Sequence, residues 1–152
     1  MEINDKVADF VLQDEEGQTV RLKDYAGTPV VLFFYPRDSM PQCREEAINF
    51  SDREEDFLSH GAVVMGVSQD DILCHADFCE AHGLNSLLLS DVEGEVCRRY
   101  GVLHEKEMGG HMRTCVDRVT YVIDRDGVVR HVVPVQNSRD HVVEVLKLVK
   151  EM

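Results

Sequence analysis

The sequence has no long apolar run, no low-complexity tract and few prolines, and each absence excludes a class of protein. No stretch approaches the roughly 20 apolar residues that span a membrane, and residues 1–6 lack the basic flank and apolar core of a leader. We therefore expect neither export nor membrane insertion, and a cytoplasmic location. The four prolines are dispersed and no repeat or linker occurs, so residues 1–152 are expected to form a single domain.

Basic residues are also scarce relative to acidic ones. Sixteen Lys and Arg stand against 29 Asp and Glu, which gives a net charge of −13. A field of that sign repels nucleic acid and anionic membrane surfaces, and no basic or aromatic stripe opposes it. We expect no nucleic-acid or membrane partner, and we interpret the acidic surface as one that serves solubility.

Cysteine is present in an odd number, which argues against the disulfide framework of a secreted protein. The five thiols are scattered, which favours reduced cysteines with redox or packing roles; they are Cys43, Cys74, Cys79, Cys97 and Cys115. Cys97 has the setting of a small core residue, whereas Cys115 lies in a stretch that reads as irregular and could be exposed.

Metal and cofactor motifs are missing. The set Cys74, His75, Cys79 and His82 lacks the paired spacing of a structural zinc site, and one helix cannot direct all four side chains at one ion. No phosphate-binding glycine loop, dinucleotide fingerprint or Ser-His-Asp order occurs. The sequence therefore predicts no metal and no cofactor.

What is present is an alternation of strands and helices. Buried strands are expected at residues 29–35 and 62–68, and the Asp126-Gly127 pair predicts a hairpin between later strands. These patterns predict an α/β sandwich with a mixed sheet. The other expected elements are strands at 87–89, 119–123 and 128–133, and helices at 41–60, 70–82, 92–100 and after a cap at Asn137 or Ser138.

The helix expected at 41–60 has an amphipathic pattern. Its apolar positions can share one face, and Gly61 would end it. The inward set is Cys43, Ala47, Phe50, Phe57 and Leu58, and the outward set is Glu45, Glu46, Arg53 and Glu54.

Cys43 stands where this helix should begin. An apolar strand leads to it through a loop bounded by Pro36 and Pro41. The unpaired N–H groups of a first helical turn and the positive end of the helix dipole favour an anion, and the thiolate is the nucleophilic form of cysteine. A reactive thiol is one interpretation, and an inert cysteine filling a helix–strand seam is the other.

The surrounding residues resemble the peroxiredoxin family, particularly its PrxQ or bacterioferritin-comigratory-protein branch. The active-site loop of that branch reads Pro-x-x-x-Thr-x-x-Cys after a core strand, and Pro36 and Cys43 fall in the matching places. Several segments in the same order are more specific than one motif. The further similar segments are residues 5–10, 61–68, 88–91, 94–96 and 118–127. The resemblance implies a thioredoxin-like fold, a mixed central sheet flanked by helices.

The resemblance also implies a thiol-dependent peroxidase that reduces hydrogen peroxide or organic hydroperoxides. Cys43 would be the peroxidatic cysteine, Arg118 would contact its sulfur and the peroxide, and Pro36 would wall off one side of the thiol. One position departs from the family, because Met40 stands where the loop carries threonine. The threonine hydroxyl helps to position the peroxide, whereas a thioether cannot donate a hydrogen bond.

The resolving cysteine is less directly indicated. Some relatives place it five residues after the peroxidatic one, a position that is Ile48 here, and others place it on the next helix. The segment around Cys79 resembles the second version, so Cys79 is the resolving candidate of an atypical 2-Cys enzyme, and Cys74 is the weaker one. The implied reductant is thioredoxin or a similar dithiol. The expected assembly is a monomer or a weak homodimer.

Two other functions stay open. Because Met40 replaces the threonine, the protein could be a redox sensor or thiol–disulfide partner of the same fold with weak peroxidase activity. A non-catalytic binding module with a structural Cys43 is the third reading, and it predicts no fast alkylation of that thiol.

Overall fold

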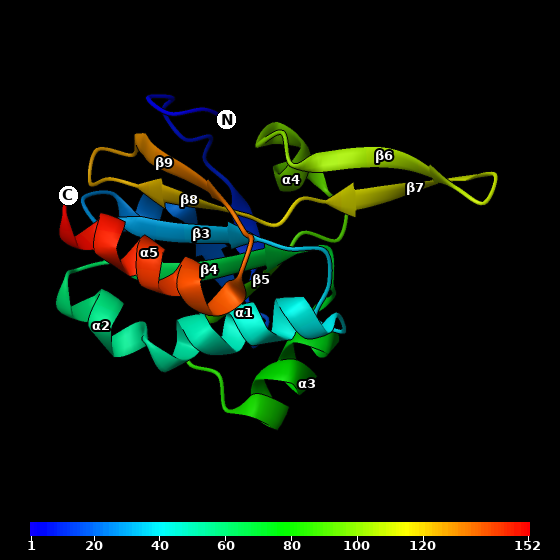
Figure 1. Cartoon of the computed structure of the whole chain (residues 1–152), viewed down its shortest axis with the longest axis horizontal. Coiled ribbons are helices and arrows are strands. Elements are labelled where there is room, and N and C mark those ends of the chain that lie inside the picture. Colours follow the sequence, from blue (N-terminus) through cyan, green and yellow to red (C-terminus); the bar gives the residue numbers. More distant parts are fainter.

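The computed structural model describes the backbone of residues 1–152 and every side chain except those of Lys106, Met108 and Ser138. Its central layer is a seven-stranded mixed sheet in the order β2-β1-β5-β4-β3-β8-β9 (Figure 1). Strands β3, β4 and β5 are parallel, and antiparallel pairs flank them on both sides. The strands are β1 (Val11–Gln13), β2 (Thr19–Arg21), β3 (Val30–Phe34), β4 (Val63–Ser68), β5 (Leu87–Ser90), β8 (Val119–Ile123) and β9 (Val129–Pro134).

Strand β3 is the middle of the core. All five of its residues are buried, and it pairs with β4 on one side and β8 on the other. Its side chains alternate between two hydrophobic clusters, with Phe33 in one and Leu32 and Phe34 in the other. A strand covered on both faces has no polar positions, which explains the continuous apolar run in the sequence.

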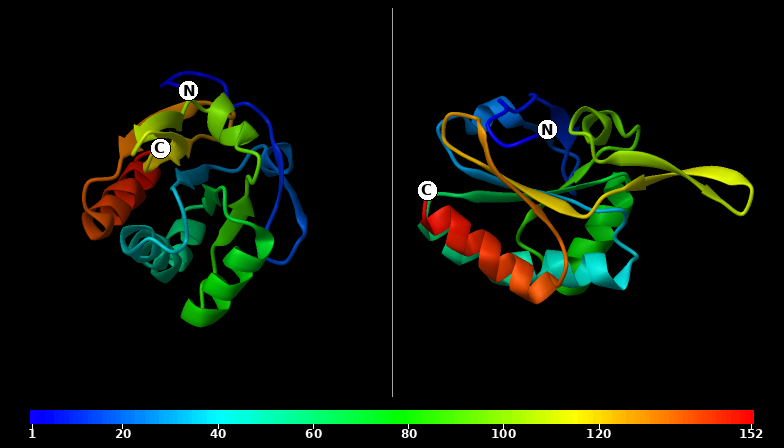
Figure 2. Two further views of the ribbon diagram at one scale, coloured as in Figure 1. Left: turned by 90° about the vertical axis from the view of Figure 1, so that its right-hand side faces the viewer. Right: turned by 45° about the horizontal axis from the view of Figure 1, so that its top comes forward.

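Helices cover both faces of the sheet unequally (Figures 1 and 2). Helices α1, α2, α3 and α5 lie against one face, and α4 and the N-terminal segment lie against the other. No helix among the described residues has the length and apolar character needed to cross a membrane. The helices are η1 (Leu22–Tyr25), α1 (Pro41–Asp52), α2 (Glu54–Ser59), α3 (Ile72–His82), α4 (Glu95–Arg99) and α5 (Ser138–Lys150).

The ends of the helices follow local sequence signals. The Asp71 side chain caps α3 by accepting from the Cys74 backbone N–H at 2.9 Å, and Gly83 ends α3 in a left-handed conformation with φ of 62°. Asn137 caps α5. The predicted apolar face of α5 is confirmed, since its inward residues are all buried: Val142, Val145, Leu146 and Val149.

The prediction of one helix over residues 41–60 was wrong. The chain forms α1 and α2, which are separated at Arg53, although Phe57 of α2 is buried in the same cluster as Phe50 of α1, as predicted. Leu58, expected inside, is 52% exposed, and Glu46, expected outside, is fully buried. The burial of Glu46 is explained by an arginine that reaches it from the sheet, as described below.

A second hairpin was also missed. Strands β6 (Leu103–Met108) and β7 (His111–Val116) pair with each other outside the main sheet and project from the body of the protein (Figure 1). Cys115 is therefore in a regular strand and half-buried rather than in an irregular stretch. The described side chains from His111 to Thr114 are exposed, so this hairpin has no apolar alternation for sequence analysis to detect.

Candidate active site

Cys43 lies in the first turn of α1, two residues after Pro41, which opens the helix. The thiol follows β3 through a short loop and is fully buried. Proline suits this position because the N–H that it lacks would have no partner within the helix. The local sequence therefore places the thiol at the helix start, as expected.

The electrostatic setting of Cys43 is a balance of opposing effects. Burial raises the pKa of the Cys43 thiol, whereas the backbone N–H of Arg37 and the charge of Arg118 act to lower it, and Glu46 and Asp38 raise it. The net direction is upward, which differs from the expectation based on the helix start. Desolvation of the thiolate outweighs the favourable contacts.

Arg118 comes directly before β8 and reaches the first turn of α1. Its Nη2 donates to the Gln42 carbonyl oxygen at 3.0 Å and to Glu46 Oε2 at 3.3 Å. The tertiary fold thus brings together two of the residues named from the sequence, Cys43 and Arg118. A guanidinium there can stabilise both a thiolate and an oxygen that leaves as an anion.

Glu46 is a site residue that the sequence analysis missed. Burial raises the pKa of Glu46 to about 7, and the charge and hydrogen bond of Arg118 oppose that rise. His141 Nε2 lies 3.7 Å from Glu46 Oε1, and burial lowers the pKa of His141 to about 4. The signal was available, since Glu46 follows Cys43 by one helical turn and shares its face.

Pro36 and Met40 occupy the two ends of the loop before Cys43. Both are half-buried, and Met40 packs against the cluster that contains Cys43. Met40 is the residue preceding α1, and its side chain makes no capping hydrogen bond. The loop therefore presents an apolar side chain where a hydroxyl would cap the helix.

Cys79 is a half-buried residue of α3 and packs against the same cluster as Cys43. Burial, followed by the charge of Glu15, raises the pKa of Cys79 to about 12. Cys74 is exposed, and Cys97 is buried in the other cluster. Of these three cysteines, Cys79 is the one that shares a hydrophobic cluster with Cys43.

One group of described side chains has the proximity of metal ligands, although the sequence did not predict it. One ligand atom from each of Asp38, Asp70 and His75 lies within 4.8 Å of the others. His75 Nδ1 lies 2.6 Å from an Asp38 carboxylate oxygen, and Nε2 lies 3.1 Å from the Leu89 carbonyl oxygen. Because both ring nitrogens face acceptors, neither offers a lone pair to a metal ion, and this group does not fit a metal site.

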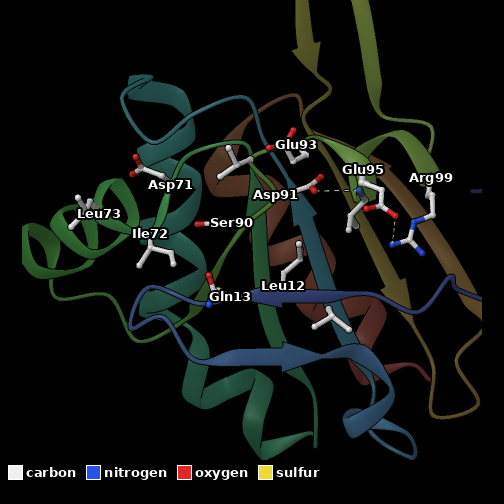
Figure 3. A pocket seen from close by; sticks show the side chains of 13 residues that line it. Leu12, Gln13, Asp71, Ile72, Leu73, Ser90, Asp91, Glu93, Glu95 and Arg99 are labelled. Atoms are coloured by element: carbon white, nitrogen blue, oxygen red, sulfur yellow. Dashed lines mark hydrogen bonds and ion pairs between the residues drawn. The ribbon is translucent and has the colours of Figure 1, made fainter.

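A pocket of about 500 Å³ opens beside the start of α3 (Figure 3). Its rim includes Leu73 and Val92, which are 74% and 54% exposed. Asp91, on its wall, accepts from the Val96 backbone N–H at 3.3 Å and so stabilises the first turn of α4. Cys43 does not line this pocket, so the pocket is separate from the candidate active site.

Comparisons with known proteins agree with this site. Residues 3–132 match the AhpC/TSA family. Peroxiredoxin Bcp of Bacillus subtilis is 38% identical over 152 residues, which cover 100% of this chain and 97% of that protein. Peroxidoxin BcpB from Mycobacterium tuberculosis has a similar structure, with a TM-score of 0.89 and 34% identity over 100% of this chain and 98% of that one.

A second similar structure is that of the bacterioferritin comigratory protein of Xanthomonas campestris. Its TM-score is 0.87 at 30% identity, with 93% of this chain and 90% of that one covered, and the structure gives insight into the alkyl peroxide reduction activity of that protein. The thioredoxin-like fold implied by the resemblance is thereby confirmed. This chain belongs to the AhpC/TSA family and is a peroxiredoxin of the Bcp/PrxQ type, a thiol-dependent peroxidase.

Proposed function

We propose that Cys43 is the peroxidatic residue of this peroxidase, in a single domain of residues 1–152. The Cys43 thiolate attacks one peroxide oxygen, the O–O bond breaks, and the other oxygen takes a proton and leaves as water or an alcohol. Cys43 is left as a sulfenic acid. The observation that carries this assignment is the contact of the Arg118 guanidinium with the first turn of α1, which directs a fixed positive charge at the reacting atoms.

Pro36 and Met40 shape the substrate site in this proposal. Pro36 has no N–H and shields one side of the sulfur without competing for its hydrogen bonds. Met40 adds an apolar, polarisable side chain in place of a hydroxyl. We infer a preference for organic hydroperoxides over hydrogen peroxide, in keeping with the alkyl peroxide reduction described for the Xanthomonas campestris protein.

Cys79 is the proposed resolving residue, which makes the enzyme an atypical 2-Cys peroxiredoxin. Its thiol condenses with the Cys43 sulfenic acid, and one water leaves as the disulfide forms. Cys43 and Cys79 are 36 residues apart. The Xanthomonas campestris protein has been solved with two separate cysteine-to-serine substitutions whose positions have the same separation, 36 residues.

Recycling requires an external dithiol, and we assign this role to thioredoxin or a protein of similar chemistry. Two thiolate attacks reduce the Cys43–Cys79 disulfide and leave the partner oxidised. The chain would act as a monomer or weak homodimer. Five free thiols favour a reducing compartment, and we propose the cytoplasm.

The second candidate function is a redox sensor or thiol–disulfide partner with weak peroxidase activity. Met40 favours it, because the side chain supplies no hydrogen bond to the peroxide. In that case oxidation of Cys43 would be slow and would signal rather than remove peroxide.

The deciding experiment measures peroxide consumption with thioredoxin, thioredoxin reductase and NADPH, for the parent protein and for Cys43→Ser. We expect steady turnover by the parent and none by the variant, and mass spectrometry after one equivalent of peroxide should find Cys43 linked to Cys79. Oxidation of Cys43 without turnover would support the sensor instead. Turnover by Cys43→Ser at the parental rate would refute the peroxidatic assignment.

A further inference from the structure

A buried hydrogen-bond network holds the loop before Cys43, and Asp38 is its centre. One carboxylate oxygen of Asp38 accepts from the Tyr35 hydroxyl at 2.6 Å, and the other lies 2.6 Å from His75 Nδ1. The Asp38 backbone N–H donates to Asp70 Oδ2 at 2.7 Å. Its carbonyl oxygen accepts from Arg44 Nε at 2.8 Å. Side chain and peptide of Asp38 are thus fixed from several directions.

His75 is the part of this network that comes from another layer of the fold. The side chain belongs to α3 and is fully buried. Its Nδ1 faces the Asp38 carboxylate, and its Nε2 lies 3.1 Å from the Leu89 carbonyl oxygen and 3.3 Å from Ser68 Oγ. The Ser68 hydroxyl already donates to Asp70 Oδ2 at 2.7 Å, so it accepts from His75. Both ring nitrogens of His75 therefore face hydrogen-bond acceptors, and the contact with Asp38 through Nδ1 is the shortest of them.

The fixed Asp38 has a direct consequence at the reacting sulfur. Arg37 is the preceding residue, and its backbone N–H acts to lower the pKa of the Cys43 thiol. The Arg37 carbonyl oxygen also accepts from the Met40 backbone N–H at 3.3 Å, which closes the turn leading into α1. Because neighbouring peptide planes share the Cα between them, a displaced Asp38 would redirect the Arg37 N–H.

We propose that His75 is a positioning residue for the reaction of Cys43, acting through Asp38 and the backbone N–H of Arg37. This inference rests on the proposed peroxidatic role of Cys43. His75 also precedes Cys79 by four residues, one turn of α3. Helix α3 therefore carries the proposed resolving thiol and also holds the loop before Cys43 through His75. When α3 moves to form the disulfide, that loop is released.

The coupling follows from the geometry that a disulfide requires. The two Cα atoms must come within about 7 Å, which requires cysteines on separate helices to move towards each other. Movement of α3 withdraws His75 from Asp38, and the loop with Cys43 then loses one of its anchors. Cys43 is oxidised while α3 is packed in place and His75 contacts Asp38, whereas the disulfide forms after α3 has moved away. The His75–Asp38 pair therefore favours the first step and opposes the second.

Two substitutions separate this role from a purely structural one. In His75→Asn the amide nitrogen can replace Nδ1 and donate to Asp38, whereas in His75→Gln it replaces Nε2 and donates to Leu89. Both remove the ring from a buried position. The control is His82→Gln, which changes an exposed histidine at the end of the same helix.

The first step is measured in a Cys79→Ser background, as the second-order rate of sulfenic acid formation with a peroxide at pH 6 to 10. We expect His75→Gln to lower the rate at pH 7 about tenfold and to move its pH profile about one unit to higher pH, the effect of one unit in the pKa of the thiol. His75→Asn should stay within about threefold of the parent. In proteins that retain Cys79, His75→Gln should form the disulfide faster once the sulfenic acid is present.

Three results would contradict different parts of the proposal. An unchanged pH profile in His75→Gln, or equal losses in the Asn and Gln variants, would overturn the positioning role. Slower disulfide formation in His75→Gln would overturn the coupling to α3. A parent protein that forms no sulfenic acid at Cys43 would instead refute the proposed function itself, so the two failures are distinguishable.

Discussion

Arg118 and Glu46 form an ion pair one helical turn beyond Cys43, with Arg118 Nη2 3.3 Å from Glu46 Oε2. The Glu46 side chain is completely buried, and Arg118 is partly exposed. The charge of the arginine therefore acts both on the Cys43 thiol and on a carboxyl group whose pKa is about 7. The role of Arg118 can therefore be tested through the oxidation rate of Cys43, and that of Glu46 through the pH dependence of stability.

Replacing Arg118 by alanine should slow the oxidation of Cys43. One charge-assisted contact is worth roughly 2 to 3 kcal/mol, which corresponds to a decrease of up to about a hundredfold in the second-order rate. Stopped-flow measurement of sulfenic acid formation tests this. Arg130→Ala is the matched control, because Arg130 pairs with Asp124 at the β8–β9 turn and has no contact with the described site. Equal rates for both variants would reduce Arg118 to a structural ion pair.

Glu46→Gln should change how stability depends on pH. The folded pKa of Glu46, about 7, is above its unfolded value of 4.5. Between those values the unfolded chain releases the proton while the folded protein keeps it, so rising pH favours unfolding. The parent should lose up to about 3 kcal/mol relative to the variant between pH 4.5 and 7, with little further change above.

Urea unfolding of both proteins from pH 4 to 8 measures this difference. The low pKa of His141 destabilises both folded proteins as pH falls from 6.5 towards 4. Because His141 lies 3.7 Å from Glu46, His141→Gln is added to both proteins, so that the remaining difference reports on Glu46. A difference that does not vary with pH would show that Glu46 does not titrate in this range.

Met40→Thr should make the protein react faster with hydrogen peroxide. The new hydroxyl can donate to the substrate, and it can also cap α1, which adds about 1 kcal/mol of stability. Met40→Val is the control, since valine has the shape of threonine without the hydroxyl. If Met40→Thr is slower than the parent with a bulky organic hydroperoxide, the methionine side chain contributes to binding that substrate.

Cys79→Ser should accumulate sulfenic and then sulfinic acid at Cys43 and lose thioredoxin-dependent turnover. Cys74→Ser, on the same helix but exposed, should keep the disulfide and the turnover. Peptide mapping after stoichiometric peroxide distinguishes these outcomes. A bond from Cys43 to Cys74 or Cys115, or one between two chains, would overturn the resolving assignment and leave Cys43 as the peroxidatic residue.

Local sequence determined much of this protein. The apolar run of β3, the Asp71 and Gly83 ends of α3 and the Asp126-Gly127 turn of the β8–β9 hairpin each depend on neighbouring residues, because burial periodicity and backbone preference act over a few positions. Local signals of the same kind predicted that Cys43 lies at the start of a helix. The resemblance then supplied Arg118, whose role no local pattern indicates.

Tertiary structure decided the properties that depend on residues distant in sequence. Glu46 is buried because Arg118 reaches it across 72 positions, and His75 meets Asp38 across 37. The direction of the Cys43 pKa shift depends on the depth of burial, which no local pattern measures. Desolvation and ion pairing act through space, so the sequence alone could identify the thiol but not the charges and hydrogen bonds that surround it.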